Sequence, residues 1–198
     1  MLSIGSQISQ AIAVDKDDVS WYTAYTWVGG NFKVKSYANL DLRIGLGKVI
    51  SAISSIPTSW SWTYTSASSD LVANISYDLW LSNNSNSTGA SSSSTFEVMI
   101  WLSARGGTYP AGSQVGTASV NGATWKLFKG TVSTWTVFTF LAPNEITKFN
   151  SDLSEFLNFL TIKHNVPSSQ FLVQAQAGTE VFIGNANLTT NSYSISVN

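Results

Sequence analysis

Short runs of alternating apolar and polar residues recur along most of the chain. The runs are rich in Val, Ile, Thr, Tyr and Trp and lie between turn residues. They read SWYTAYTWV (20–28), SWSWTYT (59–65), NISYDLWLS (74–82), FEVMIWLS (96–103), ATWKLFKG (123–130), WTVFTFLA (135–142), FLVQAQAG (171–178) and SYSISV (192–197). A period of two is typical of half-buried strands, and many closely spaced strands favour a sandwich or barrel. The pattern predicts an all-β fold.

One segment, residues 147–164, has a helical period instead. Its apolar residues are three or four positions apart, as on one face of a helix, and they are Phe149, Leu153, Phe156, Leu157 and Leu160. Ser151 or Asp152 can cap the start, and Pro167 follows the end. We expect one helix packed outside a sheet. The polar tract 82–94 is expected to be a hairpin loop, and residues 1–198 are expected to form a single domain.

Composition narrows the classes of partner. Charged residues make up 11% of the chain and the net charge is −1, against a usual charged share of about 25%. Since no basic patch is present, we expect no nucleic-acid partner. No apolar run approaches the ~20 residues of a membrane helix, so no membrane partner is expected. The start, MLSIGSQISQAIA, has no basic residue and is a poor match to a signal peptide.

The run FEVMIWLS places a carboxylate in an apolar strand. With a period of two, Phe96, Val98, Ile100 and Leu102 point to one side, which is an ordinary core face. Glu97, Met99, Trp101 and Ser103 point to the other side. That second face is a poor core, but it would suit a groove that binds a molecule with apolar faces and polar edges, such as a sugar.

Two further strands repeat this arrangement. Asp78 lies on the same face as Trp80 in SYDLWLS, and Glu180 lies on the same face as Phe182 in AGTEVFIG. A single strand glutamate usually faces water, and most tryptophans of a β-sandwich belong to its core. Three acidic residues, each followed two positions later by an aromatic residue or Met, favour a groove instead. The other two glutamates, Glu145 and Glu155, are expected in a turn and on the helix, where water would solvate them.

Other kinds of catalytic site have little support. The chain has no cysteine and a single histidine, His164, so a zinc site is not expected. His164 falls at the predicted helix end, where a cation suits the helix dipole, and a structural role is favoured. No nucleotide-binding fingerprint is present. Paired-carboxylate chemistry remains. N-glycosylation sequons begin at Asn74, Asn83, Asn86 and Asn187.

The motifs SYDLWLS, FEVMIWLS and AGTEVFIG, in this order, resemble the signatures of glycoside hydrolase family 12. The likeness extends from about Trp21 to the C-terminus and includes KVKSYANLDL, VISAISSIPTSWSW and the closing SYSISV. It implies a β-jelly-roll sandwich of two antiparallel sheets. The segment around VKSYAN and the C-terminal tail are most similar to the fungal xyloglucan-specific branch.

The resemblance implies a role for each acidic residue. Glu97 matches the family's nucleophile, Glu180 its acid/base and Asp78 the carboxyl that supports the nucleophile. Met99, Trp101, Phe182, Trp27 and Pro110 are expected to bind the sugar chain. Two carboxylates held close together disfavour each other's charge, so one pKa should rise, and we expect Glu180 to be the neutral one. No metal or organic cofactor is implied.

Two features depart from the family pattern. The N-x-W-G motif that lines one end of the family's cleft is not found in Met1–Val19, and Val181 and Ile183 stand where the family has Pro and Thr. Because both glutamates are retained, the chain is still expected to act as a secreted, monomeric, retaining endo-β-1,4-glucanase on xyloglucan. The alternatives are a non-catalytic β-glucan-binding jelly roll, favoured by the missing motif, and a structural β-domain without a ligand.

Overall fold

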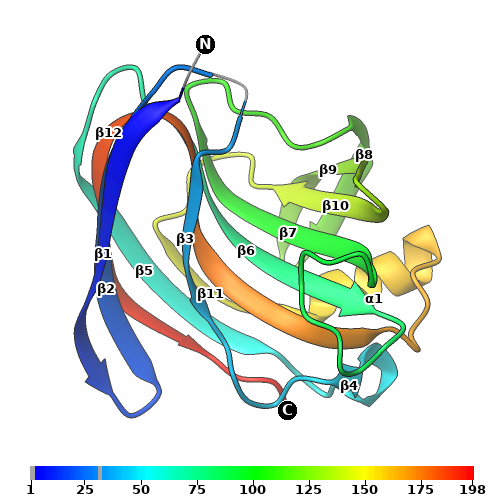
Figure 1. Ribbon diagram of the computed structural model, residues 1–198. Coiled ribbons are helices and arrows are strands. Elements are labelled where there is room, and N and C mark those ends of the chain that lie inside the picture. Colours follow the sequence, from blue (N-terminus) through cyan, green and yellow to red (C-terminus); the bar gives the residue numbers. More distant parts are fainter. Residues whose placement is uncertain (1–2, 31–32) are drawn as a thin grey trace.

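The structure is a computed structural model that describes residues 3–30 and 33–198, and its strands are arranged in two layers (Figure 1). In chain order the elements are β1 (Ile4–Asp15), β2 (Asp18–Val28), β3 (Ser36–Asp41), β4 (Lys48–Val49), η1 (Ile50–Ala52), β5 (Pro57–Ala67), β6 (Val72–Ser82), β7 (Ser94–Arg105), β8 (Ser113–Val120), β9 (Ala123–Val132), β10 (Trp135–Leu141), β11 (Lys148–Asp152), α1 (Ser154–His164) and β12 (Phe171–Ile195). The expected all-β architecture with one α-helix is confirmed.

The long strand β12 links the two layers. Its first half pairs with β3, β4 and β6, and its second half pairs with β2 and β5. We call the layer of β3, β4, β6 to β10 and the first half of β12 the cleft sheet, and the layer of β1, β2, β5, β11 and the second half of β12 the back sheet. Gly184 lies where β12 passes from one sheet to the other. Its φ of 109° and the Leu71 Cα, 2.7 Å from where a Cβ would be, both call for glycine.

One strand pair departs from the expected antiparallel arrangement. β10 runs parallel to β7, with Thr136 opposite Phe96 and Leu141 opposite Trp101. β9 then pairs with β10 in the antiparallel sense. The alternation within each strand reveals which side chains share a face, but it does not reveal the direction of the neighbouring strand. The parallel pair therefore could not be seen in the sequence.

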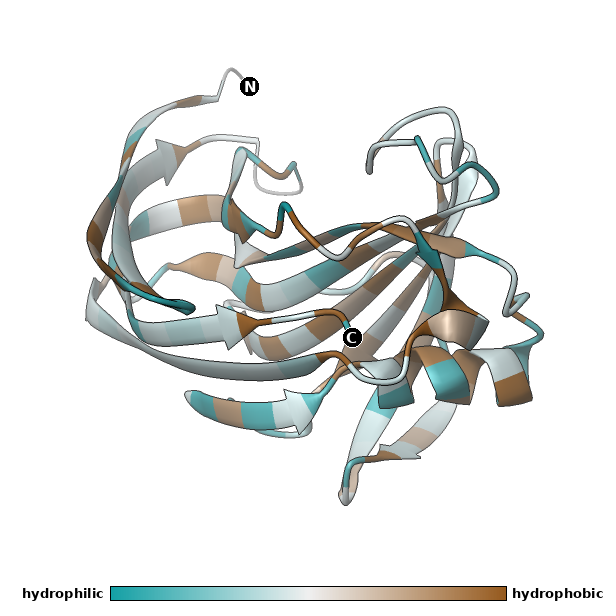
Figure 2. Ribbon diagram, turned by 90° about the horizontal axis from the view of Figure 1, so that it is seen from below, coloured by the Kyte–Doolittle hydropathy of each residue, from teal (hydrophilic) through white to brown (hydrophobic). Residues whose placement is uncertain are grey.

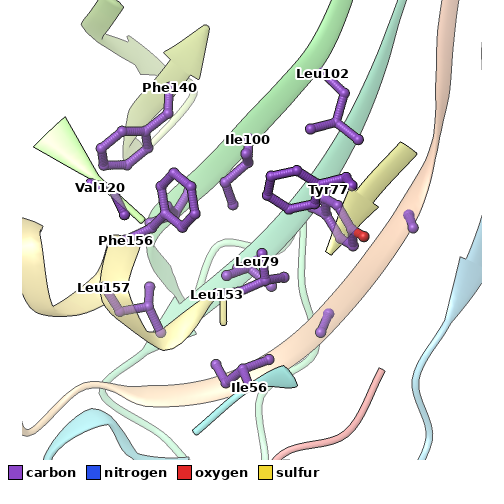
Figure 3. Packing of buried hydrophobic residues seen from close by; sticks show 14 of the residues in the cluster. Ile56, Tyr77, Leu79, Ile100, Leu102, Val120, Phe140, Leu153, Phe156 and Leu157 are labelled. Carbon is purple, nitrogen blue, oxygen red and sulfur yellow. The ribbon is translucent and has the colours of Figure 1, made fainter. Parts of the chain in front are cut away.

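The core lies between the two sheets and follows the predicted faces. Val98, Ile100 and Leu102 are fully buried, and Phe96 is partly buried against the same cluster. Figure 3 shows Ile100 and Leu102 of β7 beside Leu79 and Tyr77 of β6, with side chains of the helix segment facing them. From the back sheet, Trp60 packs edge-on against Tyr77 and against Tyr193, and the ring of Tyr193 is tilted by 33° to that of Tyr77. The register predicted for FEVMIWLS is confirmed.

The helix α1 adds to the core by packing against strands of the cleft sheet. Its Phe156 packs edge-on against Trp125 of β9 and Phe140 of β10. Leu153 is the N-cap of α1, so neither Ser151 nor Asp152 holds the predicted cap position. Asp152, the last residue of β11, still supports the helix start, because its Oδ1 accepts hydrogen bonds from the Ser154 N–H at 2.9 Å and from the Ile56 N–H at 2.7 Å. The predicted helical pattern began too early, since Phe149 lies on β11 and packs into the core from a strand.

The remaining elements agree with the sequence pattern. Tract 82–94 joins the antiparallel strands β6 and β7, as expected for a hairpin loop. Figure 2 shows hydrophobic and hydrophilic residues in bands along the strands, including hydrophobic bands on β1. β1 is an edge strand whose Ile4, Ile8 and Ile12 are exposed. Within residues 3–30 and 33–198, no helix is long and apolar enough to cross a membrane.

Candidate active site

A cleft of about 520 Å³ lies on the cleft sheet, on the face opposite the core. Its lining brings together residues from β3, β6, β7, β9, β10 and β12 and from loops: Val34, Tyr37, Asp78, Trp80, Ala90, Glu97, Met99, Trp101, Tyr109, Ala111, Val132, Trp135, Val137, Glu180 and Phe182. All three predicted carboxylates are in this set. Of the five predicted sugar-binding residues, Met99, Trp101 and Phe182 are also in it.

Glu97 lies in the middle of the cleft sheet, on β7. Its side chain is buried among Met99, Trp101 and the residues of β6 and β10. The indole N–H of Trp135 donates a hydrogen bond of 2.7 Å to Glu97 Oε2. Burial raises the pKa of Glu97 to about 7; the charge of Glu180 acts in the same direction, and the Trp135 hydrogen bond opposes it.

Asp78 lies on the neighbouring strand β6, opposite Met99. The indole N–H of Trp80 donates to Asp78 Oδ2 at 3.0 Å, whereas Oδ1 is buried and has no partner among the described residues. Burial raises the pKa of Asp78 well above its ordinary value, and the charges of Glu97 and Glu180 raise it further. Both effects favour the form of Asp78 that holds its proton.

Glu180 is held on the other side of the cleft, on β12. Asn74 of β6 clamps it twice: its side-chain amide donates to Glu180 Oε2, and its Oδ1 accepts the Glu180 backbone N–H at 2.9 Å. Burial raises the pKa of Glu180, and the Asn74 hydrogen bond lowers it. Tyr37 of β3 pairs with Glu180 across the strands and also lines the cleft.

The expected split of pKa values is only partly found. The sequence suggested that Glu180 alone would be pushed toward the neutral form by its partner's charge. In the structure all three carboxyls have raised pKa values, and the first cause in each case is burial rather than charge repulsion. The reason is that aromatic side chains enclose all three groups, which alternation along single strands could not show.

Two predicted sugar-binding residues lie outside the cleft lining. Trp27 of β2 packs against the cluster around Tyr25 and Leu71, and its ring lies beneath Gly5 of β1. Pro110 is buried, although its neighbours Tyr109 and Ala111 do line the cleft. Trp27 lies on β2, which belongs to the back sheet, and position in the sequence alone did not show which sheet that strand joins.

Sequence reasoning missed several residues of the site. Trp135 shares the non-core face of β10 with Val137, but only the parallel register with β7 brings it to Glu97. Tyr37 is within the motif KVKSYANLDL, which gave no hint of its place opposite Glu180. Asn74 begins a sequon, but its side chain is fully buried against Glu180, so it is not an accessible glycosylation site.

Glu145 and His164 lie outside the cleft, and their surroundings differ from those expected. Glu145 is not simply solvated: Arg105 forms a two-point ion pair with it at 2.8 Å, and Ser103 donates to it at 2.6 Å. His164 does end α1, beside the rings of Phe138 and Phe159. Its pKa is lowered by burial and by the charge of Lys129, which does not favour the expected cation.

Comparison with known proteins agrees with this fold and cleft. Residues 3–198 match the family model of Glycosyl hydrolase family 12. A probable xyloglucan-specific endo-beta-1,4-glucanase A of Aspergillus terreus is 43% identical over 185 residues, which cover 91% of this chain and 71% of that protein. Xyloglucan-specific endo-beta-1,4-glucanase 1 of Phytophthora sojae is 41% identical over 98% of this chain and 80% of its own length.

Solved structures agree in the same way. The family 12 endoglucanase 3 of Trichoderma harzianum superimposes with a TM-score of 0.93 at 35% identity, over 99% of this chain and 85% of that one. The family 12 xyloglucanase of Bacillus licheniformis gives a TM-score of 0.83 at 25% identity, over 97% and 86% of the two chains. The β-jelly-roll sandwich and the family resemblance are confirmed. The chain belongs to glycosyl hydrolase family 12, a family of glycoside hydrolases.

Proposed function

We propose that this protein is a retaining endo-β-1,4-glucanase that acts on xyloglucan, with Glu97 as nucleophile, Glu180 as acid/base and Asp78 as the group that supports Glu97. The observation that carries the proposal is the meeting of these three carboxyls in one aromatic cleft. They come from three separate strands, β6, β7 and β12. Burying a carboxyl costs free energy, so three of them on one face favour a functional role over a structural one.

The proposed reaction has two steps. In the first, an ionised Glu97 oxygen attacks the anomeric carbon and forms a glycosyl ester, while Glu180 gives its proton to the departing sugar oxygen. In the second, water attacks the same carbon and loses a proton to Glu180, and the bond to Glu97 breaks. Each step inverts the anomeric centre once, so the product keeps the β-configuration.

The raised pKa values of Glu180 and Asp78 suit this division of labour. Glu180 must hold a proton before the first step, and burial raises its pKa in that direction. Burial and the charges of Glu97 and Glu180 raise the pKa of Asp78, and an Asp78 that holds its proton adds no second negative charge beside Glu97. A neutral Asp78 allows Glu97 to ionise at a lower pH than a charged one would.

The lining of the cleft suits a chain of sugar rings. Trp135, Phe182 and the largely exposed Tyr109 supply aromatic surface, which packs well against the apolar faces of a pyranose. The named relatives from Aspergillus terreus and Phytophthora sojae are xyloglucan-specific endoglucanases, and this supports xyloglucan as the substrate. We infer internal cleavage, because the cleft lies along the face of a sheet.

The remaining expectations stand as parts of the same proposal. We propose that residues 1–198 act as one domain and that the protein is a monomer. We also propose that it is secreted, because its substrate is a wall polymer outside the cell. Its partner is that polysaccharide rather than nucleic acid or a membrane. Gel filtration with light scattering tests the monomer, and the culture medium of an expressing host, probed with a specific antibody, tests secretion.

A carbohydrate-binding jelly roll is the rival function. Binding a sugar chain needs aromatic surface and hydrogen bonds, but it does not need three carboxyls whose surroundings make them costly to ionise. The Asn74 clamp on Glu180 and the Trp135 hydrogen bond to Glu97 would also have no purpose in simple adhesion. These features favour the enzyme.

A reducing-sugar assay on xyloglucan, carboxymethyl-cellulose and mixed-linkage glucan tests the proposal. We expect the highest rate on xyloglucan, a rapid fall in viscosity and mixed oligosaccharides as early products. Binding to xyloglucan without any release of reducing ends would support the rival function instead. Release of one small sugar from the outset would contradict internal cleavage.

A further inference from the structure

Two tryptophans each donate a hydrogen bond to a carboxyl of the Asp78 and Glu97 pair. Trp135 Nε1 donates to Glu97 Oε2 at 2.7 Å, and Trp80 Nε1 donates to Asp78 Oδ2 at 3.0 Å. The reaction described above gives neither indole a task. Their two rings meet edge to face, with centroids 5.1 Å apart and planes at 71°.

The strand order explains how the two rings reach each other. β7 lies between β6, which carries Trp80, and β10, which carries Trp135. Trp80 is directly opposite Glu97 in the β6–β7 register, and Val137 is opposite Glu97 in the β7–β10 register, two residues beyond Trp135. The two indoles therefore meet across β7 at the position of Glu97, and each limits the movement of the other.

Each hydrogen bond leaves one oxygen of its carboxyl available. Trp135 engages Glu97 Oε2, and no other described side chain donates to Glu97, so Oε1 is the oxygen left to attack a sugar carbon. Trp80 engages Asp78 Oδ2, while Oδ1 has no described partner, so Oδ1 is the atom left to carry the proton. In each carboxyl, therefore, one oxygen accepts an indole hydrogen bond and the other is left for the chemistry.

No cation helps to hold negative charge here. The titratable groups that line the cleft together with Glu97 are Asp78, Glu180, Tyr37 and Tyr109, and the described lining includes no lysine or arginine. Neutral N–H donors are then the means by which a carboxylate can be stabilised. The Trp135 hydrogen bond favours the ionised form of Glu97.

We propose that Trp135 and Trp80 are positioning residues for the nucleophile: Trp135 holds Glu97 ionised with Oε1 free, and Trp80 holds Asp78 so that its proton stays on Oδ1. The inference rests on the proposed role of Glu97. The two indoles have unequal duties. Loss of the Trp135 donor makes Glu97 harder to ionise, whereas loss of the Trp80 donor makes the already neutral Asp78 only more firmly neutral.

The first test compares the pH profiles of kcat/KM on xyloglucan for Trp135→Phe and Trp80→Phe, which remove an N–H and keep an aromatic ring. We expect the acidic limb of Trp135→Phe to move upward by about 1 pH unit, with about a tenfold loss of rate below it. The limb of Trp80→Phe should stay in place. Trp62→Phe is the control, because the buried indole N–H of Trp62 has no hydrogen-bond partner among the described residues. The acidic limb of its pH profile should not move.

The second test needs no activity. In 15N-labelled protein, we expect the indole signal of Trp135 to shift with pH as Glu97 ionises, and this titration should vanish in Glu97→Gln. It reports the contact even if the protein proves not to hydrolyse glucans, so failure of this inference is distinguishable from failure of the proposed function. An indole signal of Trp135 that does not titrate, or equal limbs in Trp135→Phe and wild type, would overturn the proposal.

Discussion

The two faces of β6 and β7 are almost equally buried, yet they differ completely in chemistry. On the core face, Leu79, Val98 and Ile100 are fully hidden between the sheets. On the cleft face, Asp78 and Glu97 retain exposures of only 4% and 9%. Exposure therefore does not identify the functional face. What identifies it is the presence of groups whose burial costs free energy.

That difference predicts opposite consequences for substitution on the two faces. Apolar side chains between the sheets stabilise the fold by their burial, at roughly 25 cal/mol for each Å² removed from water. Carboxyls with raised pKa values do the reverse, because the folded protein holds their charge less readily than water does. The core face should lose stability when it is altered, and the cleft face should lose activity.

The largest effect is expected at Glu97. Glu97→Ala removes the nucleophile and should reduce turnover on every substrate by at least about 10⁴-fold. Glu180→Ala should retain the first step on activated aryl glycosides, whose leaving groups need no proton, and should then stall. Azide should rescue it and give a β-glycosyl azide, whereas rescue of Glu97→Ala should give the α-azide. Product analysis by NMR distinguishes the two.

The control for both variants is Glu155→Ala, since Glu155 is exposed on α1. Its rate should equal that of the wild type. An α-azide from the Glu180 variant would reverse the two assignments.

The next effect is on the core face. Ile100→Ala should lower the free energy of unfolding by about 2–5 kcal/mol, because it leaves a cavity where Leu79 and Phe156 lie close by. Urea denaturation followed by tryptophan fluorescence measures the loss. The activity of the folded fraction should remain near that of the wild type. A loss below about 1 kcal/mol would show that this face is not a tightly packed core.

On the cleft face, by contrast, replacing a carboxyl should raise the free energy of unfolding, and the effect should depend on pH. The pKa of Glu97 is raised to about 7 in the folded protein, so between about pH 4.5 and 7 the folded state holds more protons than the unfolded state. Stability is therefore lost as the pH rises through this window. Glu97→Gln does not titrate, and at pH 8 it should be more stable than the wild type by roughly 3 kcal/mol.

Thermal melting of both proteins at pH 4.5 and pH 8 tests this. We expect the advantage of Glu97→Gln to appear only at the higher pH. An advantage of equal size at both pH values would mean that the charge of Glu97 is not its cause.

The smallest effect is expected at the Asn74 clamp. Asn74→Ala removes the donor that lowers the pKa of Glu180, so Glu180 should keep its proton to higher pH. The basic limb of the kcat/KM profile should move upward by about 1 pH unit, with a lower maximum because the carboxyl is held less firmly. A basic limb that moves downward would contradict the clamp.

Much of the fold was predictable from local pattern. The alternation in FEVMIWLS correctly divided core from cleft, because strand side chains alternate whatever the neighbouring strands are. The same rule placed Asp78 and Glu180 on the cleft face. The helix was predicted from its apolar spacing, although Phe149 was assigned to it when it belongs to β11.

What could not be predicted depends on contacts between distant strands. Trp135 reaches Glu97 through a parallel pairing of β10 and β7, and Asn74 reaches Glu180 across 106 residues of sequence. Trp27 has the same local pattern as the cleft tryptophans, but it lies on the back sheet. Alternation assigns a residue to a face of its strand, and the order and register of strands decide what it faces.

The most direct test of the central claim is to trap the covalent intermediate. A 2-deoxy-2-fluoro β-glycoside with an activated leaving group should form the glycosyl ester rapidly and release it slowly, since the fluorine disfavours the transition states of both steps. Digestion and tandem mass spectrometry then locate the sugar. The account predicts one labelled carboxyl, that of Glu97. A label on Glu180 or Asp78, or no label together with a product of inverted configuration, would contradict it.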